Sequence, residues 1–318
     1  MTRLGRTIVN LALLLGLAAW PVAAMAQEHG QEPGHAESSS QIDISHHLGN
    51  SHEFLGLELP RFAPVHIGGL TVDFSPTKHL MFMLTAATLV LLIFVSSARA
   101  VARAQAAGRP AKGFAGAMEA TALYIRQEVI LPNVGHHGEG YVPYLLTLFF
   151  FILGMNLLGL LPGGATATGN ISVTAALAVV AFLVIEITGM RALGTTGYLK
   201  TIFYLPHGLP GGIGGAFLKV VLLAVMTPIE LIGKLAKPFA LAVRLFANMT
   251  AGHVLLGVLF GMAISGGLLI GWLPFAFTVA INVLEVGIAF IQAYIFTILT
   301  CVYLGDAFHL HGHDEHAH

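Results

Sequence analysis

PFALAVRLFANMTAGHVLLG, residues Pro238 to Gly257, is a long apolar helix pattern that carries one permanent charge, Arg244, in its middle. An arginine near the centre of a membrane helix costs about 2.5–3.5 kcal/mol. Its guanidinium stays protonated, so it cannot pick up and release a proton, but it can hold a positive potential in one place. We therefore interpret Arg244 as a fixed gate for a passing ion. The alternative is that it snorkels to a helix end or pairs with a buried acid for structural reasons.

The other polar residues of this helix can be placed by a rotation of about 100° per residue. Asn248 follows Arg244 by four residues and shares its face. Lys237 and Glu230, seven and fourteen residues earlier, return to nearly the same face. His253 follows by nine residues and points to the opposite side. The pattern therefore predicts one titratable group that does not face Arg244.

The composition identifies the class of protein. With 318 residues, 56% hydrophobic and 10% charged, and a mean hydropathy of +0.79, the chain is not a soluble globular protein. Several apolar runs of about 18 residues or more indicate a helical protein that crosses a membrane repeatedly. A net charge of −1 and the lack of a basic stripe indicate no nucleic-acid partner. A single cysteine, Cys301, excludes a disulfide framework.

The N-terminus resembles a secretory signal over residues 1–26. Arg3 and Arg6 form a basic start, Ile8 to Trp20 an apolar core, and Ala24-Met25-Ala26 a small-x-small cleavage site. The alternative is an uncleaved first helix. Both leave the following segment on the outer face of the membrane.

Residues 27–77 are predicted to form a polar, His-rich periplasmic extension with one short amphipathic piece from Phe54 to Phe62. Its histidines could bind a metal ion; they are His29, His35, His46, His47 and His52. Their spacing is irregular, which favours a solvated extension. A second His-rich segment, residues 306–318, is predicted to be a cytoplasmic tail.

The first half of the membrane domain is predicted to contain three spans. The predicted elements are a span at 79–95, an amphipathic inner-surface helix at 113–132, a turn at 135–140, spans at 141–161 and 171–190, and an inner loop at 194–215. The loop after the first span carries Arg99, Arg103, Arg109 and Lys112. Basic loops stay on the cytoplasmic side, which sets the orientation of the chain.

Two long helices are predicted to complete the domain, at residues 217–261 and 266–304. At 1.5 Å per residue they would be roughly 65 Å and 55–60 Å long, about twice the thickness of the ~30 Å hydrocarbon core. Either the prolines of the first helix divide it, or the pair is a strongly tilted hairpin. We favour the hairpin, with its uncharged turn at Ser265 to Leu273 facing outward and the C-terminus inward.

The second long helix carries Asn282, Glu285 and Gln292 on one face, because they are spaced by three and seven residues. A carboxylate at such depth either becomes neutral or lies in a wet cleft, and both suit a proton relay. The alternative is a glutamate buried purely for packing.

Four ordered motifs resemble subunit a of rotary F-type ATP synthases. They are RLFANM at Arg244 to Met249 with Lys237-Pro238 ahead, QAYIF at Gln292 to Phe296 followed by Leu299-Thr300 and Tyr303-Leu304, and the upstream stretches PYLLTLFFFILGMNLLGLLPG and TATGNISVTAAL. The resemblance runs from about residue 70 to 305. It implies an all-α membrane protein of about five membrane-embedded helices and one amphipathic helix on the inner surface.

The resemblance also implies residue roles in proton translocation. Arg244 matches the arginine that faces the carboxylates of a ring of c subunits and separates two aqueous half-channels. Asn248 matches the asparagine one turn on, and Gln292 the glutamine near the arginine on the facing helix. Glu230 matches an acidic position in the half-channel open to the cytoplasm.

His253 and Glu285 occupy positions where many relatives have the reverse order, glutamate and then histidine. The exchange preserves one acid and one imidazole, which we interpret as a proton-conducting pair in the outer half-channel. The chain departs from the family at Ala247, where glycine is common, and at Ala236 and Ala240, where serine is frequent. These alanines make the inner access path less polar.

The resemblance implies a multi-pass protein of the bacterial inner membrane with a periplasmic N-terminus and a cytoplasmic C-terminus. Its implied partners are the c ring, b-type peripheral stalk subunits, the F1 sector and the lipid bilayer. No cofactor, metal site or catalytic residue is expected. The chain has no GxxxxGK[ST] loop, so nucleotide chemistry must belong to partner subunits. The alternatives are a stand-alone metal-ion transporter with His-rich ends and a non-conducting scaffold.

Overall fold

The computed structural model describes residues 53–54, 57–58, 65–67, 70–72, 78–161, 167–203 and 213–309. The predicted signal peptide, most of the His-rich extension and the end of the tail lie outside the described residues. The described part of the extension forms two short antiparallel hairpins. Strand β1 (Glu53–Phe54) pairs with β2 (Leu57–Glu58), and β3 (Val65–Ile67) pairs with β4 (Leu70–Val72). The predicted amphipathic piece therefore contains strands.

From residue 78 onward the described chain is helical, as predicted. Its main helices are α3 (Lys78–Ala106), α4 (Gly113–Tyr124), α5 (Leu131–Val134), α6 (Val142–Gly159), α7 (Ile171–Ile202), α8 (Ile213–Ser265), α9 (Gly267–Ile270) and α10 (Trp272–His309). A π-helical turn (Ile125–Ile130) joins α4 to α5, and 3-10 turns lie at Gly135–Tyr141 and Ala167–Gly169. Among the described residues, four helices are long and apolar enough to span a membrane: α3, α7, α10 and the segment Gly138–Gly159. α8 is not among these four; the prediction of about five membrane-embedded helices counts it as the fifth.

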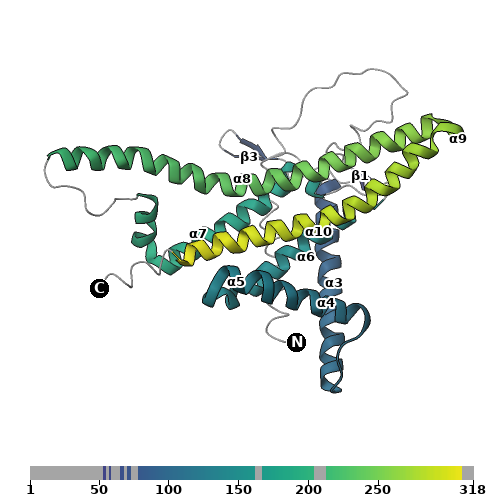
Figure 1. Cartoon of the computed structure of the whole chain (residues 1–318), viewed down its shortest axis with the longest axis horizontal. Coiled ribbons are helices and arrows are strands. Elements are labelled where there is room, and N and C mark those ends of the chain that lie inside the picture. Colours follow the sequence, from purple (N-terminus) through teal and green to yellow (C-terminus); the bar gives the residue numbers. More distant parts are fainter. Residues whose placement is uncertain are drawn as a thin grey trace.

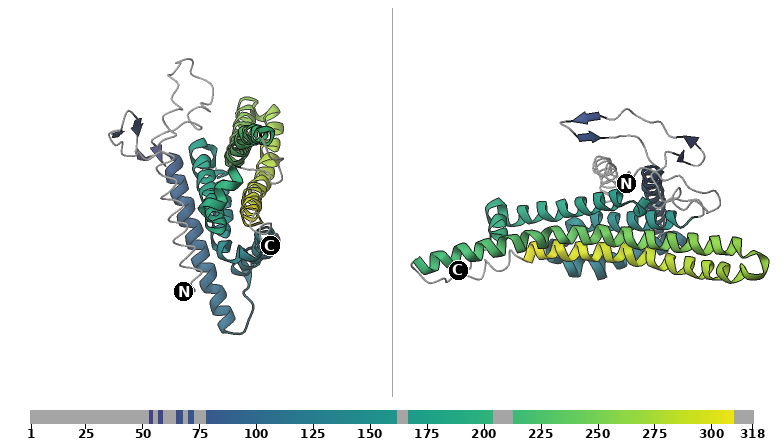
Figure 2. Two further views of the ribbon diagram at one scale, coloured as in Figure 1. Left: turned by 90° about the vertical axis from the view of Figure 1, so that its left-hand side faces the viewer. Right: turned by 90° about the horizontal axis from the view of Figure 1, so that it is seen from above.

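The two long helices form the tilted hairpin that the sequence predicts. α8 is one continuous helix of 53 residues, about 80 Å long at 1.5 Å per residue, and Pro228 and Pro238 do not divide it. α8 and α10 run side by side across α3 rather than along it (Figures 1 and 2). The turn between them lies at residues 266–271, within the predicted range. The hairpin solves the length problem because only a tilted helix of this size can keep its apolar surface at membrane depth.

α3 is longer than predicted. It continues through Arg99 and Arg103 to Ala106, so these two arginines lie on a helix and only Arg109 and Lys112 lie in the connection to α4. The extension SSARAVARAQA is rich in alanine, the residue with the highest helix propensity. Gln105 near the end of α3 donates a hydrogen bond to Glu119 of α4 (3.2 Å), which holds α4 against it.

α7 also continues beyond its predicted end. Asn170 caps its start, accepting a hydrogen bond from the Ser172 amide (2.8 Å). Helical structure resumes after Gly194, whose φ of 71° and ψ of 160° interrupt the helix, and ends at Ile202. The predicted inner loop 194–215 is therefore helical at its beginning and, from Ile213, at its end.

α6 lies at the centre of the molecule. Nearly every side chain from Val142 to Met155 is buried, and the long helices α3 and α10 pack against α6. Phe150 packs edge-on against Phe94 of α3, with ring centroids 4.5 Å apart. A helix that is apolar on all sides has to be surrounded by other helices or by lipid. α6 thus provides the surface against which α10 packs, while α8 packs against α7 and α10.

Candidate functional site on the α8–α10 hairpin

Arg244 lies on the exposed side of α8. Leu241, Leu245 and Met249 form a stripe at four-residue spacing that is 1–3% exposed and packs inward. This packing turns Arg244 away from the core, and its side chain is exposed. Within the described part of the chain, it forms no ion pair or side-chain hydrogen bond. Its charge is therefore accessible from outside the chain.

The two polar residues expected beside Arg244 lie in different surroundings. Asn248, one turn along α8, is exposed like Arg244. Gln292 of α10 is only 7% exposed and belongs to the buried face of that helix. No hydrogen bond joins Gln292 to Arg244 in the described structure. The structure thus places Arg244 and Asn248 on one surface and Gln292 in the core.

Glu285 is buried at the interface between α10 and α8. Its side chain is 5% exposed, and neither carboxylate oxygen has a hydrogen-bond partner among the described residues. Oε1 lies so close to Gly252 of α8 that a Cβ atom at position 252 would overlap it. His253, half-buried, is the next residue. The hairpin therefore brings Glu285 and His253, the predicted acid and imidazole, to the same position along its length.

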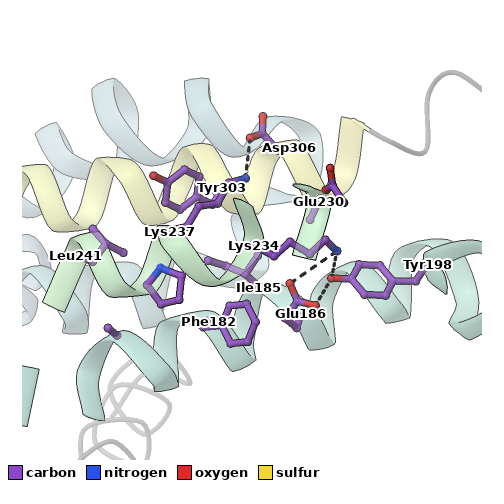
Figure 3. Close-up of a pocket in the computed structure, with 13 residues that line it drawn as sticks. Phe182, Ile185, Glu186, Tyr198, Glu230, Lys234, Lys237, Leu241, Tyr303 and Asp306 are labelled. Carbon is purple, nitrogen blue, oxygen red and sulfur yellow. Dashed lines mark hydrogen bonds and ion pairs between the residues drawn. The ribbon is translucent and has the colours of Figure 1, made fainter. Parts of the chain in front are cut away.

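Glu230 lies beside a cavity of about 80 Å³ between α7, α8 and α10 (Figure 3). Lys237 and Asp306 lie across it, with Nζ and Oδ2 3.9 Å apart. Lys237 also lies 4.6 Å from the centroid of the Tyr303 ring. Leu241 lines the cavity, and Arg244, three residues further along α8, does not. The predicted tail segment beginning at residue 306 starts inside α10, which continues to His309.

The sequence reasoning missed three polar residues of this cavity: Glu186, Tyr198 and Lys234. Tyr198 donates a hydrogen bond to Glu186, and Lys234 donates one to the Tyr198 hydroxyl (2.6 Å). A signal was present in the sequence, because Glu186 is the only charged residue in the apolar run 171–190. An ionisable residue inside a membrane segment is itself a reason to expect a functional site.

Two polar zones thus lie on opposite sides of Arg244 along α8. Lys234 of the cavity is ten residues before it, and His253, beside the Glu285 contact at Gly252, is nine residues after it. At 1.5 Å per residue these separations are about 15 Å and 13 Å along the helix axis. The buried side chains of Leu245 and Met249 lie between them.

The comparisons with known proteins agree with the motifs. A family model described as ATP synthase A chain matches residues 80–305. ATP synthase subunit a 2 of Chlorobaculum tepidum is 38% identical over 304 residues, covering 94% of this chain and 82% of its own length. Subunit a of Chloroherpeton thalassium is 38% identical, covering all of this chain and 95% of its own. Subunit a of Anaeromyxobacter dehalogenans is 34% identical, with 98% and 92% coverage. The chain is a multi-pass protein of a bacterial membrane and belongs to the ATP synthase A chain family, the a subunits of the membrane sector of rotary ATP synthases.

Proposed function

We propose that this chain is the proton-translocating stator subunit of its ATP synthase, with Arg244 as the fixed cation between two aqueous half-channels. The observation that carries the proposal is the order along α8: a polar cavity, then an accessible arginine without an internal partner among the described residues, then a buried acid beside a histidine. Apolar side chains separate the two polar zones. This order is what a gate between two half-channels requires.

The mechanism uses carboxyl groups carried by a ring of c subunits. A neutral carboxyl group can face lipid at little cost, whereas a carboxylate cannot. Beside Arg244 the charged form is favoured, so the ring acid loses its proton into one half-channel. It can leave the arginine only after it is protonated from the other half-channel. Each proton contributes about 2.3 kcal/mol per 100 mV of membrane potential, and the geometry makes the motion directional.

The two polar zones are assigned to opposite sides of the membrane by the positive-inside expectation for Arg109 and Lys112. The cavity with Glu230 then belongs to the inner half-channel, and His253 with Glu285 to the outer one. An imidazole ordinarily titrates near neutral pH, so His253 can exchange protons with Glu285 during turnover. In this arrangement the N-terminus is periplasmic and the C-terminus cytoplasmic.

Asn248 and Gln292 are proposed to support the arginine. Asn248 lies on the same exposed surface and can orient the guanidinium or the ring carboxylate. Gln292 lies behind this surface, on the buried face of α10. A side-chain rotation could bring its amide to the arginine when a ring acid is bound. The peripheral stalk and the F1 sector complete the proposed set of partners.

The decisive test replaces Arg244 in the whole complex reconstituted in vesicles. We expect Arg244→Ala to abolish ATP-driven proton pumping and ATP synthesis. Without the arginine, a ring carboxyl group could pass this position while still protonated, and ring rotation would no longer be coupled to proton transfer. Passive proton leak is expected to persist or rise, since the barrier between the half-channels is weakened. Arg109→Ala, in the exposed connection between α3 and α4, is the matched control and should pump normally.

Normal pumping by Arg244→Ala would contradict the proposal. So would an equal loss in Arg109→Ala, which would point to a general effect of lost positive charge. The amount of the subunit in each purified complex has to be measured, so that failed assembly is not mistaken for failed gating.

The alternative of a stand-alone metal-ion transporter has less support. It requires several metal ligands that converge within membrane helices. The described helices do not bring three histidine, cysteine or acidic side chains together in such a group. The His-rich ends that motivate this alternative lie largely outside the described residues. Family membership favours the ATP synthase function.

A further inference from the structure

The cavity beside α8 contains a hydrogen-bonded chain of three ionisable side chains from two helices. Tyr198 of α7 donates to Glu186 Oε2, and its hydroxyl oxygen accepts from Lys234 Nζ of α8 at 2.6 Å. Lys234 and Glu186 side chains are only 15% and 19% exposed. Figure 3 shows the three groups pointing toward one another at one end of the cavity, with Glu230 on the neighbouring turn.

The position of Tyr198 depends on the break in α7. Gly194 turns the chain, so the segment after it folds back and Tyr198 returns to the body of the same helix. The ring packs on Gly189, where a Cβ atom would lie 2.7 Å from a ring carbon. Tyr198 is 6% exposed. Backbone geometry and packing therefore hold its hydroxyl between the acid and the amine.

Tyr198 is the link between the two charged groups. Lys234 Nζ and Glu186 Oε1 are 3.9 Å apart, which is too far for a hydrogen bond. A tyrosine hydroxyl can donate and accept at the same time, so it can pass a proton from one neighbour to the other. A purely structural ion pair at this place would not need the hydroxyl between its partners.

We infer that Glu186, Tyr198 and Lys234 form a proton relay in the access path that ends at this cavity. The inference rests on the proposed proton-translocating function and adds a route to it. The other charged or titratable groups at the cavity are Glu230 and Lys237 on α8, and Tyr303 and Asp306 on α10. Glu230 is exposed, so it can exchange protons with both water and the relay.

The relay step conserves protons and charge. The Lys234 ammonium gives a proton to the Tyr198 oxygen while the tyrosine O–H proton passes to the Glu186 carboxylate. The products are a neutral amine, an intact hydroxyl and a neutral carboxylic acid. Glu186 then releases its proton to water, and the Lys234 amine takes one up from Glu230 or from water. One proton has crossed, and the reverse sequence carries it the other way.

The test uses Tyr198→Phe in the assembled complex in vesicles, because phenylalanine keeps the ring on Gly189 and removes only the hydroxyl. Pumping per assembled complex should fall roughly two- to tenfold, the range that corresponds to a lost hydrogen bond. The deficit should grow as the pH on the cavity side rises. At a low proton concentration, delivery of protons through the access path limits the rate, so loss of the relay has its largest effect. Glu186→Gln is the second variant and should show the same pH-dependent deficit.

Tyr144→Phe is the matched control. Tyr144 is 4% exposed, and its hydroxyl has no hydrogen-bond partner among the described residues, so its removal should leave pumping unchanged. Wild-type rates in Tyr198→Phe would overturn the relay. Reduced assembly with normal pumping per complex would also overturn it, because the three side chains would then only stabilise the packing of α7 on α8. Arg244→Ala measured in parallel separates the two proposals: if it is inactive while Tyr198→Phe is normal, only the relay fails.

Discussion

The Glu285 carboxylate of α10 lies directly against Gly252 of α8, in a space that a side chain at position 252 would occupy. The Glu285 carboxylate is thus buried in the space left by the absent side chain of Gly252, which is the residue before His253. Burying an ionisable group without hydrogen bonds is costly, so this position is unfavourable for stability alone, which supports the proton-transfer role proposed for Glu285. The close approach also makes position 252 sensitive to substitution.

Gly252→Ala should displace the Glu285 carboxylate, because the added methyl group overlaps Oε1. Misplacing a proton-transfer group by about 1 Å can lower its rate by up to about 100-fold. We expect a large loss of ATP-driven pumping in vesicles that hold the assembled complex. Gly233→Ala, on the same helix, is the control, because a Cβ added there would meet no atom within 4 Å. Equal effects at both positions would mean that helix propensity, and not the overlap with Oε1, is responsible.

Exchanging the acid and the imidazole should be better tolerated than losing either. His253→Ala and Glu285→Ala each remove a proposed proton-transfer group, and we expect proton conduction to fall by about 100-fold or more. The double exchange His253→Glu with Glu285→His keeps both groups at one level of the hairpin. Passive proton conduction through the membrane sector measures all three. If the double exchange is the most damaging, the two residues do not work as a pair.

Asn156→Ala should destabilise the helix packing without touching the ionisable groups. Asn156 is fully buried in α6; its Oδ1 accepts from Thr168 (2.8 Å) and its Nδ2 donates to the Ala289 carbonyl of α10 (3.4 Å). Leaving buried polar groups unsatisfied costs about 1–3 kcal/mol. A lower temperature of unfolding for the purified complex should report the loss. Ser96→Ala, which removes a local hydrogen bond at an exposed site, should change the stability far less.

Gly305→Ala should weaken the contact between α10 and α5. A Cβ at position 305 would overlap the carbonyl oxygen of Asn133, and a backbone atom cannot move aside cheaply. Overpacking of this kind costs about 1–3 kcal/mol. Gly287→Ala on the same helix meets nothing within 4 Å and is the control. The two variants can be compared by the resistance of the C-terminal segment to proteolysis. Equal resistance would show that the contact contributes little.

Much of the membrane domain could be predicted from local patterns. The helix pairs, the turn at residues 266–271 and the shared face of Arg244 and Asn248 follow from apolar runs and a 3.6-residue period. The family could also be identified from short motifs such as RLFANM. These features depend on residues close together in the chain, which is why sequence alone is informative about them.

Other features required contacts between distant segments. The helical end of α7 is predicted as a loop because residues 194–215 are rich in glycine and proline. Packing of Tyr198 on Gly189 and its hydrogen bonds to Glu186 and Lys234 stabilise it instead. The strands near residue 54 were also missed, because runs of two or three residues give too short a pattern.

The sequence by itself determined that the chain is a helical membrane protein, that α8 and α10 are too long to stand upright, and that one permanent charge lies within an apolar helix. Hydrophobicity, length and rotation per residue suffice for these conclusions. Only the tertiary structure decided that Glu285 fits against Gly252 and that Glu186, Tyr198 and Lys234 converge on one cavity. Those relationships depend on how separate helices cross, and no local pattern encodes the crossing.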